Sequence, residues 1–187
     1  MARVRIVYPV DNETVKSTNF FVLCRVAGGV GQAQALLVDN GGVQRYQGLP
    51  WATSSRNYQL FIFHGVNPGT YNLQILDAAG NLLATSANVT IRPVLGIGIQ
   101  YPRSDGDHVC PSFLSFGTTS NADPITGTFN GIKGNTTVQP GSLGLWCVEF
   151  GGAQFHDGDV GNLVISSPTP MSSNKNSIVL DINECTV

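Results

Sequence analysis

The 187-residue chain carries little charge: Asp, Glu, Lys and Arg make up only 12% of it, and the formal net charge is −2. Nucleic-acid binding depends on clustered Lys and Arg that release counterions from the phosphate backbone. The 10 Lys and Arg residues of this chain are scattered along it. We therefore expect no nucleic-acid partner.

Long apolar runs are missing as well. No stretch approaches the roughly 18 apolar residues that a membrane-spanning helix needs, so we expect no membrane insertion. The beginning of the chain, MARVRIVYPV, lacks the apolar segment and small-residue cleavage site of a signal peptide. This predicts either a mature or shortened secreted protein, or one that was never exported by a signal peptide.

Cysteine is scarce too. The four cysteines have no CxxC spacing and no neighbouring His at the intervals of zinc ligands: Cys24, Cys110, Cys147 and Cys185. A structural zinc site is therefore not expected. Their number alone does not decide whether the protein matures in an oxidising compartment.

Turn residues and short alternating apolar segments dominate the rest of the chain. Glycine occurs 22 times, and apolar residues alternate with polar ones in segments such as Tyr71, Leu73 and Ile75, with no helical period of useful length. In ALLVDNGGVQRY, residues 35–46, Asn40 and Gly41 predict a β-hairpin closed by a type I′ turn.

The chain also contains an internal repeat. IVYPVDNETVKSTNFFVL (6–23) has a counterpart in IQYPRSDGDHVCPSFLSF (99–116). One offset of 93 positions relates three pairs: Pro9 and Pro102, Tyr8 and Tyr101, and Phe20 and Phe113. We predict two tandem all-β domains, 1–93 and 94–187, each an antiparallel β-sandwich of short strands.

These motifs resemble a known superfamily. YPVDNETV and YPRSDGDHV are similar to the P-x-D-G-x-x-V opening of bacterial immunoglobulin-like and fibronectin-III-like domains, and PGTYNLQILDAAGN (68–81) is similar to their penultimate strand and following turn. The resemblance implies two immunoglobulin-like (Ig-like) sandwiches, with Tyr71 as the tyrosine that ties down the E–F corner. The second domain has Gly161 where this tyrosine is expected, so its corner must be built differently.

Two Asp-Gly-Asp motifs, SDGDHV (104–109) and HDGDVGN (156–162), invite a metal hypothesis. The implied topology brings the A–B and E–F connections to one end, where four carboxylates would be neighbours: Asp105, Asp107, Asp157 and Asp159. Clustered oxygens suit Ca²⁺, whereas His108 and His156 would suit a transition metal. The interpretation that we favour is that Asp and Gly form ordinary turns, with no cofactor.

The same topology helps to predict the roles of the cysteines. The last strand ends near the A–B turn, so we expect a Cys110–Cys185 disulfide if the protein matures in an oxidising compartment. Cys24 is expected to be a small core residue. Cys147 with His108 or His156 could form a cysteine nucleophile, but no local signature surrounds it, so we predict that the protein is not an enzyme.

Three aromatic residues suggest a second hypothesis, the binding of a sugar or a protein partner. RYQGLPWATSSRNY (45–58) contains three rings among polar neighbours: Tyr46, Trp51 and Tyr58. Exposed rings of this kind stack on sugars or anchor protein partners. The alternative is that Trp51 closes the edge of the sandwich, because large aromatic residues are usually buried.

The sequence thus predicts a non-enzymatic structural or adhesive tandem module outside the cytoplasm. Two locations compete: a bacterial cell surface, and a virion in which the protein decorates the capsid or belongs to the tail. Protein partners, including copies of the chain itself, are expected in either case. The alternatives are a lectin-like adhesin that binds a glycan through the Trp51 region and a spacer pair stabilised by calcium.

Overall fold

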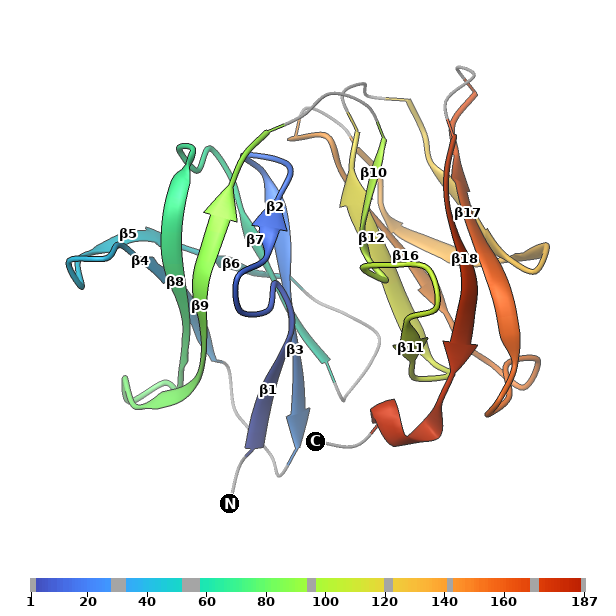
Figure 1. The fold of residues 1–187 in the computed structure, drawn as a ribbon, viewed down its shortest axis with the longest axis horizontal. Helices are drawn as coiled ribbons and strands as arrows, with labels where there is room; N and C mark the ends of the chain where they lie inside the picture. The colour runs from blue at the N-terminus through green and yellow to red at the C-terminus, as the bar shows by residue number, and fades with distance from the viewer. Residues whose placement is uncertain are drawn as a thin grey trace. The chain divides into compact units, whose positions relative to one another are not determined.

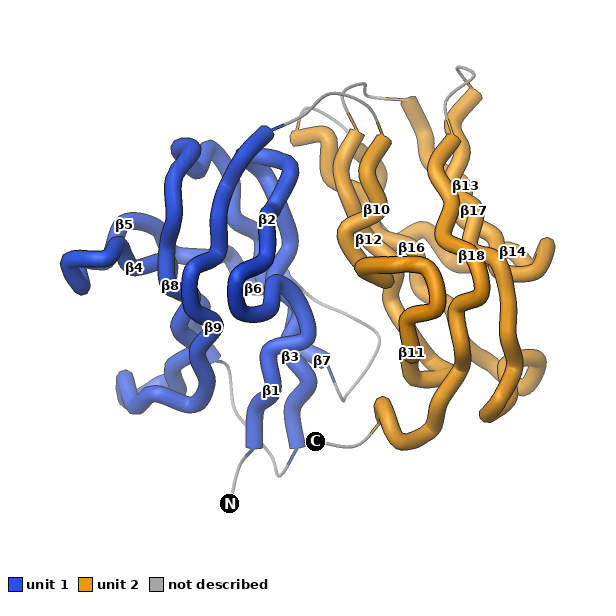
Figure 2. The backbone as a smooth tube through the Cα atoms, viewed as in Figure 1, with its two compact units in different colours: residues 1–94, 187 blue, residues 95–186 orange. Residues whose placement is uncertain are grey.

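The computed structural model describes residues 3–27, 33–51, 58–93, 97–119, 123–140, 143–168 and 172–185. The chain divides into two compact units, residues 1–94 with residue 187, and residues 95–186 (Figure 2). The division lies one residue from the boundary expected from the repeat. No helix among the described residues is long and apolar enough to cross a membrane.

Unit 1 consists of two β-sheets (Figure 1). The first has the strand order β1-β3-β7-β6, with β1 (Arg3–Tyr8), β3 (Phe20–Ala27), β7 (Tyr58–Phe63) and β6 (Leu49–Trp51). The second has the order β2-β9-β8-β4-β5, with β2 (Thr14–Val15), β9 (Leu82–Ile91), β8 (Gly69–Leu76), β4 (Gln34–Val38) and β5 (Gln44–Gln47).

Unit 2 repeats this arrangement strand for strand. Its first sheet has the order β10-β12-β16-β15, with β10 (Gly98–Tyr101), β12 (Phe113–Thr118), β16 (Leu145–Phe150) and β15 (Asn135–Val138). Its second has the order β11-β18-β17-β13-β14, with β11 (His108–Val109), β18 (Ser172–Leu180), β17 (Val160–Ser166), β13 (Thr126–Phe129) and β14 (Ile132–Lys133). A short 3₁₀ helix, η2 (Ile182–Cys185), follows β18.

This strand order is that of an Ig-like sandwich, with strands A, B, E and D in one sheet and G, F and C in the other. In both units the first strand changes sheets part-way along. After a cis Tyr-Pro bond, at Tyr8–Pro9 and at Tyr101–Pro102, the chain turns and adds a two-residue strand parallel to the last strand of the unit. The predicted fold, two tandem antiparallel Ig-like β-sandwiches, is confirmed.

The cores follow the alternation read from the sequence. In β8 and β17 every second side chain is buried, which is the pattern of strands with one face on a core. Equivalent apolar residues of the two units are fully buried: Val15, Phe20, Leu73, Ile75 and Val89 in unit 1, and Val109, Phe113, Leu163, Ile165 and Ile178 in unit 2.

The hairpin predicted at residues 35–46 forms between β4 and β5, but the predicted type I′ turn is wrong. Positive φ occurs at Gly42 (φ 79°) and not at Asn40, and the Gly42 N–H donates to the Asp39 carbonyl at 3.0 Å. The Asp39 carboxylate decides the geometry, because it accepts the backbone N–H groups of Gly41 and Val43, both at 2.9 Å. These bonds favour a three-residue loop that ends in a left-handed glycine.

A turn with the type I′ pattern occurs elsewhere, between β13 and β14. There Asn130 (φ 50°) and Gly131 (φ 79°) both have positive φ, and Phe129 pairs with Ile132 across the turn. The expectation that an Asn-Gly pair forms a type I′ turn therefore holds in this protein, but it was applied to the wrong one of the two Asn-Gly pairs. A preceding aspartate distinguishes the first pair from the second.

Candidate functional site

The first Asp-Gly-Asp motif forms a turn that docks on β18. Gly106 has a φ of 76°, as the third residue of a type II turn requires. The Asp105 carboxylate accepts the Asn176 N–H at 2.7 Å, and the Gly106 N–H donates to the Asn176 carbonyl at 2.9 Å. Both groups are therefore engaged in fixing the turn to the last strand.

Unit 1 uses the same device without a doubled acidic motif. The Asp11 carboxylate accepts the Ala87 N–H at 2.7 Å, and the Asn12 N–H donates to the Ala87 carbonyl at 2.9 Å. Asn12 has a φ of 61°, the conformation that Gly106 adopts in unit 2. The first aspartate of SDGDHV is thus a scaffold residue shared by both units.

The second motif bonds to the end of β18 and to the residue that begins the 3₁₀ helix after it. The Asp157 carboxylate accepts the Ile182 N–H at 2.8 Å, and the Gly158 N–H donates to the Leu180 carbonyl at 2.7 Å. Gly158 has a φ of 83°. Both Asp-Gly-Asp motifs therefore form turns with a left-handed glycine, placed on two sides of one strand.

The last aspartate of each motif closes its own turn. Asp107 Oδ2 accepts the Arg103 N–H at 2.7 Å, and Asp159 Oδ2 accepts the His156 N–H at 2.9 Å. Each of the four carboxylates proposed as metal ligands therefore accepts a backbone hydrogen bond.

The expectation that these carboxylates form one cluster is wrong. The turn of 104–107 precedes β11 and that of 156–159 precedes β17, and these strands flank β18 on opposite sides, about 9.6 Å apart at the spacing of neighbouring strands. Ligands of one Ca²⁺ must each lie within about 2.6 Å of it. Among the described residues, which include all four aspartates, no group of three or more His, Cys, Asp or Glu is placed to hold a metal ion.

The residues proposed for cysteine chemistry also do not lie together. Cys147 lies on β16, in one sheet, and His108 lies on β11, in the other. Burial raises the pKa of the Cys147 thiol to about 12, so it is protonated and poorly nucleophilic at neutral pH. His108 Nδ1 instead lies 3.0 Å from Asp181 Oδ2, and this contact is the main cause that lowers the pKa of Asp181.

Cys24 is buried and is not part of a disulfide. Burial raises the pKa of its thiol well above the usual value, in keeping with a small core residue.

Unit 2 lacks the corner tyrosine, and an asparagine in the turn between β13 and β14 instead bonds to the beginning of β17. In unit 1 the Tyr71 hydroxyl donates to the Asn67 carbonyl at 3.1 Å, which is the expected tyrosine corner. In unit 2 the Asn130 side chain brackets Gly161: its amide donates to the Val160 carbonyl at 3.2 Å, and its oxygen accepts the Asn162 N–H at 2.9 Å.

The space of the absent tyrosine side chain is filled from β13. A Cβ atom on Gly161 would lie 2.5 Å from Cζ of Phe129 and 2.6 Å from Nδ2 of Asn130. The Phe129 ring also packs edge-on against Phe113, with ring centroids 5.6 Å apart. Sequence reasoning missed this solution, although the Asn-Gly pair after Phe129 indicated a tight turn there.

The predicted cysteine pair is bonded. Cys110, just after β11, and Cys185, in η2, form a disulfide with Cα atoms 4.9 Å apart and 75 positions apart in sequence. The bond joins the beginning of unit 2 to the end of its last strand. Together with the Asp157 contact, it holds the segment that follows β18, whereas Asp105 contacts the middle of that strand.

The three proposed ligand-binding aromatic residues do not share one surface. Tyr58 is only 7% exposed, and its hydroxyl accepts a hydrogen bond from the buried Arg25 at 2.7 Å. The Tyr46 ring packs edge-on against Tyr71, 5.8 Å away. Trp51, on the edge strand β6, is 42% exposed, which is too exposed for a residue that closes the core. The segment 52–57 lies outside the described residues.

A feature that sequence reasoning missed is a groove in unit 1 with a volume of about 400 Å³. It lies between β1 and β9, and its walls include Arg5, Asp11 and Ser86. Ser86 is buried, and its hydroxyl has no hydrogen-bond partner. The one sign of this groove is that β2 is much shorter than its neighbour β9. The sequence does not show this difference, because it does not show which strands pair.

Comparison with known proteins finds distant similarity to solved structures. No protein-family model matches the chain, and no curated protein matches it. Among solved structures, a biofilm-associated protein (BSP domain) has 13% identity and a TM-score of 0.48, over 96% of this chain and 29% of that chain. The chain therefore spans less than a third of the length of that structure.

Two further structures are similar at the same level. CopC from Methylosinus trichosporium OB3b has 16% identity and a TM-score of 0.39, over 50% of this chain and 95% of that chain. The titin pair A168–A169 has 15% identity and a TM-score of 0.32, over 97% of this chain and 98% of that chain. The assignment to Ig-like sandwiches rests on the strand order of this chain.

Proposed function

We propose that the chain is a non-enzymatic structural or adhesive module of two Ig-like domains, displayed on a virion or on a bacterial cell surface. The observation that carries this proposal is that the side chains best suited to metal binding or catalysis have structural roles. The four aspartates of the Asp-Gly-Asp motifs fix turns, and the free thiols are buried. Such a chain is built to hold a shape and to present surfaces.

The disulfide supports a location outside the reducing cytosol. Structural disulfides form and persist in oxidising surroundings, and reduced cytosolic proteins rarely contain them. The Cys110–Cys185 bond therefore favours a protein that matures at a cell surface, in a secreted state or on an extracellular particle.

Fractionation of the native source tests the proposal. An antibody against the chain should detect it with virus particles or with the cell envelope after sedimentation through a density gradient. Thiol alkylation before and after reduction, read by mass spectrometry, should show Cys110 and Cys185 protected and then released. Recovery in the soluble cytosolic fraction with all four thiols reduced would refute it.

A lectin-like adhesin is the second candidate, because Trp51 and Leu49 are both strongly exposed on β6, at 42% and 55%. An exposed indole beside an apolar neighbour is a surface on which a sugar ring can stack. A glycan array probed with the wild-type chain and with Trp51→Ala tests this role. Binding that is unchanged in the variant, or absent from both proteins, would eliminate it.

A further inference from the structure

Four side chains with a carbonyl carbon are followed directly by glycine: Asn40, Asp105, Asn130 and Asp157. In such a pair the glycine nitrogen can attack the side-chain carbonyl carbon of the residue before it and close a succinimide ring. Glycine favours this reaction, because it has no side chain to hinder the approach and its backbone adopts many conformations. The attacked side chain must also be free to turn toward the nitrogen. Its hydrogen bonds in the folded protein therefore decide which pair reacts.

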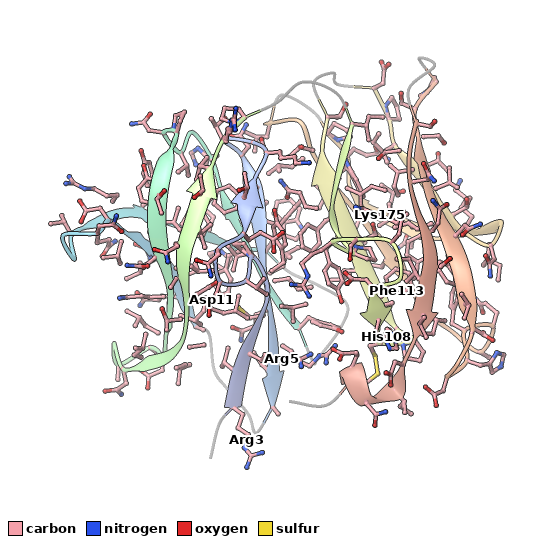
Figure 3. The ribbon with its side chains drawn as sticks, viewed as in Figure 1. Arg3, Arg5, Asp11, His108, Phe113 and Lys175 are labelled. Carbon is pink, nitrogen blue, oxygen red and sulfur yellow. A yellow bond between two sulfur atoms is a disulfide. The ribbon has the colours of Figure 1, made fainter. Side chains whose placement is uncertain are left out.

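Both Asp-Gly pairs are held by bonds to other parts of unit 2. The Asp105 carboxylate accepts the Asn176 N–H at 2.7 Å, and the Asp157 carboxylate accepts the Ile182 N–H at 2.8 Å. Figure 3 labels Lys175, the neighbour of Asn176 on β18. An ionised carboxylate is in addition a poor target for a nitrogen nucleophile, because it already carries a negative charge. These two pairs are therefore protected in the folded protein.

The Asn130-Gly131 pair is held by both ends of its side-chain amide. Asn130 Nδ2 donates to the Val160 carbonyl at 3.2 Å, and Asn130 Oδ1 accepts the Asn162 N–H at 2.9 Å. Its Cγ, the atom that must be attacked, lies only 2.7 Å from the place that a Cβ on Gly161 would take, so the amide packs against the backbone of β17. Attack would require the loss of both bonds and of this packing.

The Asn40-Gly41 pair is different. The Asn40 side chain is exposed and, within the part of the chain that the structure describes, has no hydrogen-bond partner. The pair lies in the loop between β4 and β5 (Figure 1). The Gly41 N–H donates to the Asp39 carboxylate at 2.9 Å, and this bond must break before the nitrogen can attack. It is an exposed bond, so water can take the place of the carboxylate at little cost.

We infer that Asn40 is the residue at which this protein deamidates. The Gly41 nitrogen forms a bond to Asn40 Cγ, and its proton passes through water to the side-chain nitrogen, which leaves as ammonia when its bond to Cγ breaks. Water then opens the succinimide at either of its carbonyl carbons. Opening at Cγ gives aspartate, whereas opening at the main-chain carbon gives isoaspartate, in which the backbone runs through the side chain.

Both products change the loop between β4 and β5. Isoaspartate lengthens the backbone of a loop whose shape Asp39 fixes through the N–H groups of Gly41 and Val43. Either product also adds a carboxylate next to Asp39, which already pairs with Arg45 at 2.7 Å. Deamidation therefore alters the charge and the shape of a surface of unit 1, wherever the protein is displayed.

A comparison of the two Asn-Gly pairs in the wild-type chain, with its disulfide intact, tests the inference. The protein is incubated at mildly alkaline pH, folded or in urea, and peptide mass spectrometry follows the loss of Asn40 and of Asn130. In the folded protein Asn40 should be lost about tenfold faster than Asn130 or more, because Asn130 must first give up two hydrogen bonds. In urea the two rates should become similar.

Three results would overturn the inference. The first is loss of Asn130 in the folded protein at least as fast as that of Asn40. The second is an Asn40 that stays intact in the folded protein while the chain in urea reacts. The third is a preference for Asn40 that persists unchanged in urea, since the local sequence and not the fold would then set it.

Gly41→Ala tests the attacking group. Gly41 is not among the residues with positive φ, and a Cβ there would lie 3.3 Å from Asp39 Oδ1, so a small shift of that exposed side chain makes room for it. The added methyl hinders the attack and should slow the loss of Asn40 by about tenfold or more. Gly98→Ala, in unit 2, is the matched control and should leave the rate unchanged.

Thermal unfolding verifies that both variants are folded. An equal rate of loss of Asn40 in the wild type and in folded Gly41→Ala would refute attack by the Gly41 nitrogen. If Gly41→Ala does not fold, the comparison of folded and urea-unfolded wild type still decides. The sedimentation test of the proposed function does not depend on this chemistry, so the two can fail separately.

Discussion

Removal of the Cys110–Cys185 disulfide should destabilise unit 2 strongly. The bond closes a loop of 75 positions, and the chain-entropy relation gives a loss of about 15 cal/mol/K from the unfolded ensemble for a loop of this length, or about 4.5 kcal/mol at 25 °C. Domains of this size are stable by roughly 5–15 kcal/mol. The double variant Cys110→Ser/Cys185→Ser should therefore retain only a fraction of the stability of unit 2.

The two tryptophans of the chain make this measurable for unit 2 alone. Trp146 is fully buried in unit 2, whereas Trp51 in unit 1 is 42% exposed. In a Trp51→Phe background, tryptophan fluorescence during urea unfolding reports on unit 2. The transition should move to lower urea in the double variant, and its slope should increase, because the unfolded chain without the cross-link exposes more surface.

Reduction provides the matched control. A reducing agent should move the transition of the parent protein to nearly the same position as that of the double serine variant, and should not affect the variant itself. A loss below about 1 kcal/mol, far less than the loop-closure value, would refute the view that this bond secures unit 2.

Four further outcomes follow from the corners and turns. Tyr71→Phe removes the bond to the Asn67 carbonyl and should lower the free energy of unfolding by about 1 kcal/mol in urea titrations; an unchanged value would contradict a role for the tyrosine corner. Gly161→Ala forces a Cβ to within 2.5 Å of Phe129 and should cost about 1–3 kcal/mol, whereas a neutral effect would mean that the ring moves freely. The melting temperature should be the same with millimolar calcium and with chelator, and a rise with calcium would revive the metal hypothesis. The pKa of Asp39 is lowered, first by the hydrogen bond from the Val43 N–H and next by that from the Arg45 side chain, so its contribution to stability is present above the ordinary carboxyl pKa and is lost as the pH falls through the lowered value; Asp39→Asn should therefore reduce the acid sensitivity of the urea midpoint, and an unchanged sensitivity would count against this.

The architecture was predictable because it is encoded in local patterns. Alternation of apolar residues marks strands that have one face on a core, and the offset between Pro9 and Pro102 reveals two units. Both prolines follow a tyrosine at the point where the first strand leaves its sheet. The disulfide pair followed from topology as well, because Cys110 and Cys185 flank strands that an Ig-like sandwich places side by side.

The candidate site was harder to predict, because it depends on where each turn docks. Asp105 and Asp157 belong to identical tripeptides, and their local turns are alike, but they bond to Asn176 and Ile182 at different points of the chain after docking on opposite sides of β18. No local pattern distinguishes these destinations. Similarly, the sequence places Tyr58 among polar neighbours, and only the pairing of β7 with β3 turns its ring toward Arg25.

The sequence by itself therefore determined the repeat, the strands, the tyrosine corner and the identity of the turn-forming residues, because each depends on a few neighbouring positions. The tertiary structure decided which groups those residues bond to. The four carboxylates proposed as metal ligands accept backbone N–H groups of the last strand, of the 3₁₀ helix after it and of their own turns, because a backbone N–H group needs a hydrogen-bond partner. It also decided that the buried Ser86 hydroxyl has no hydrogen-bond partner, whereas Lys175 at the equivalent register donates to the Arg103 carbonyl, because pairing across the sandwich, and not local sequence, sets what each side chain meets.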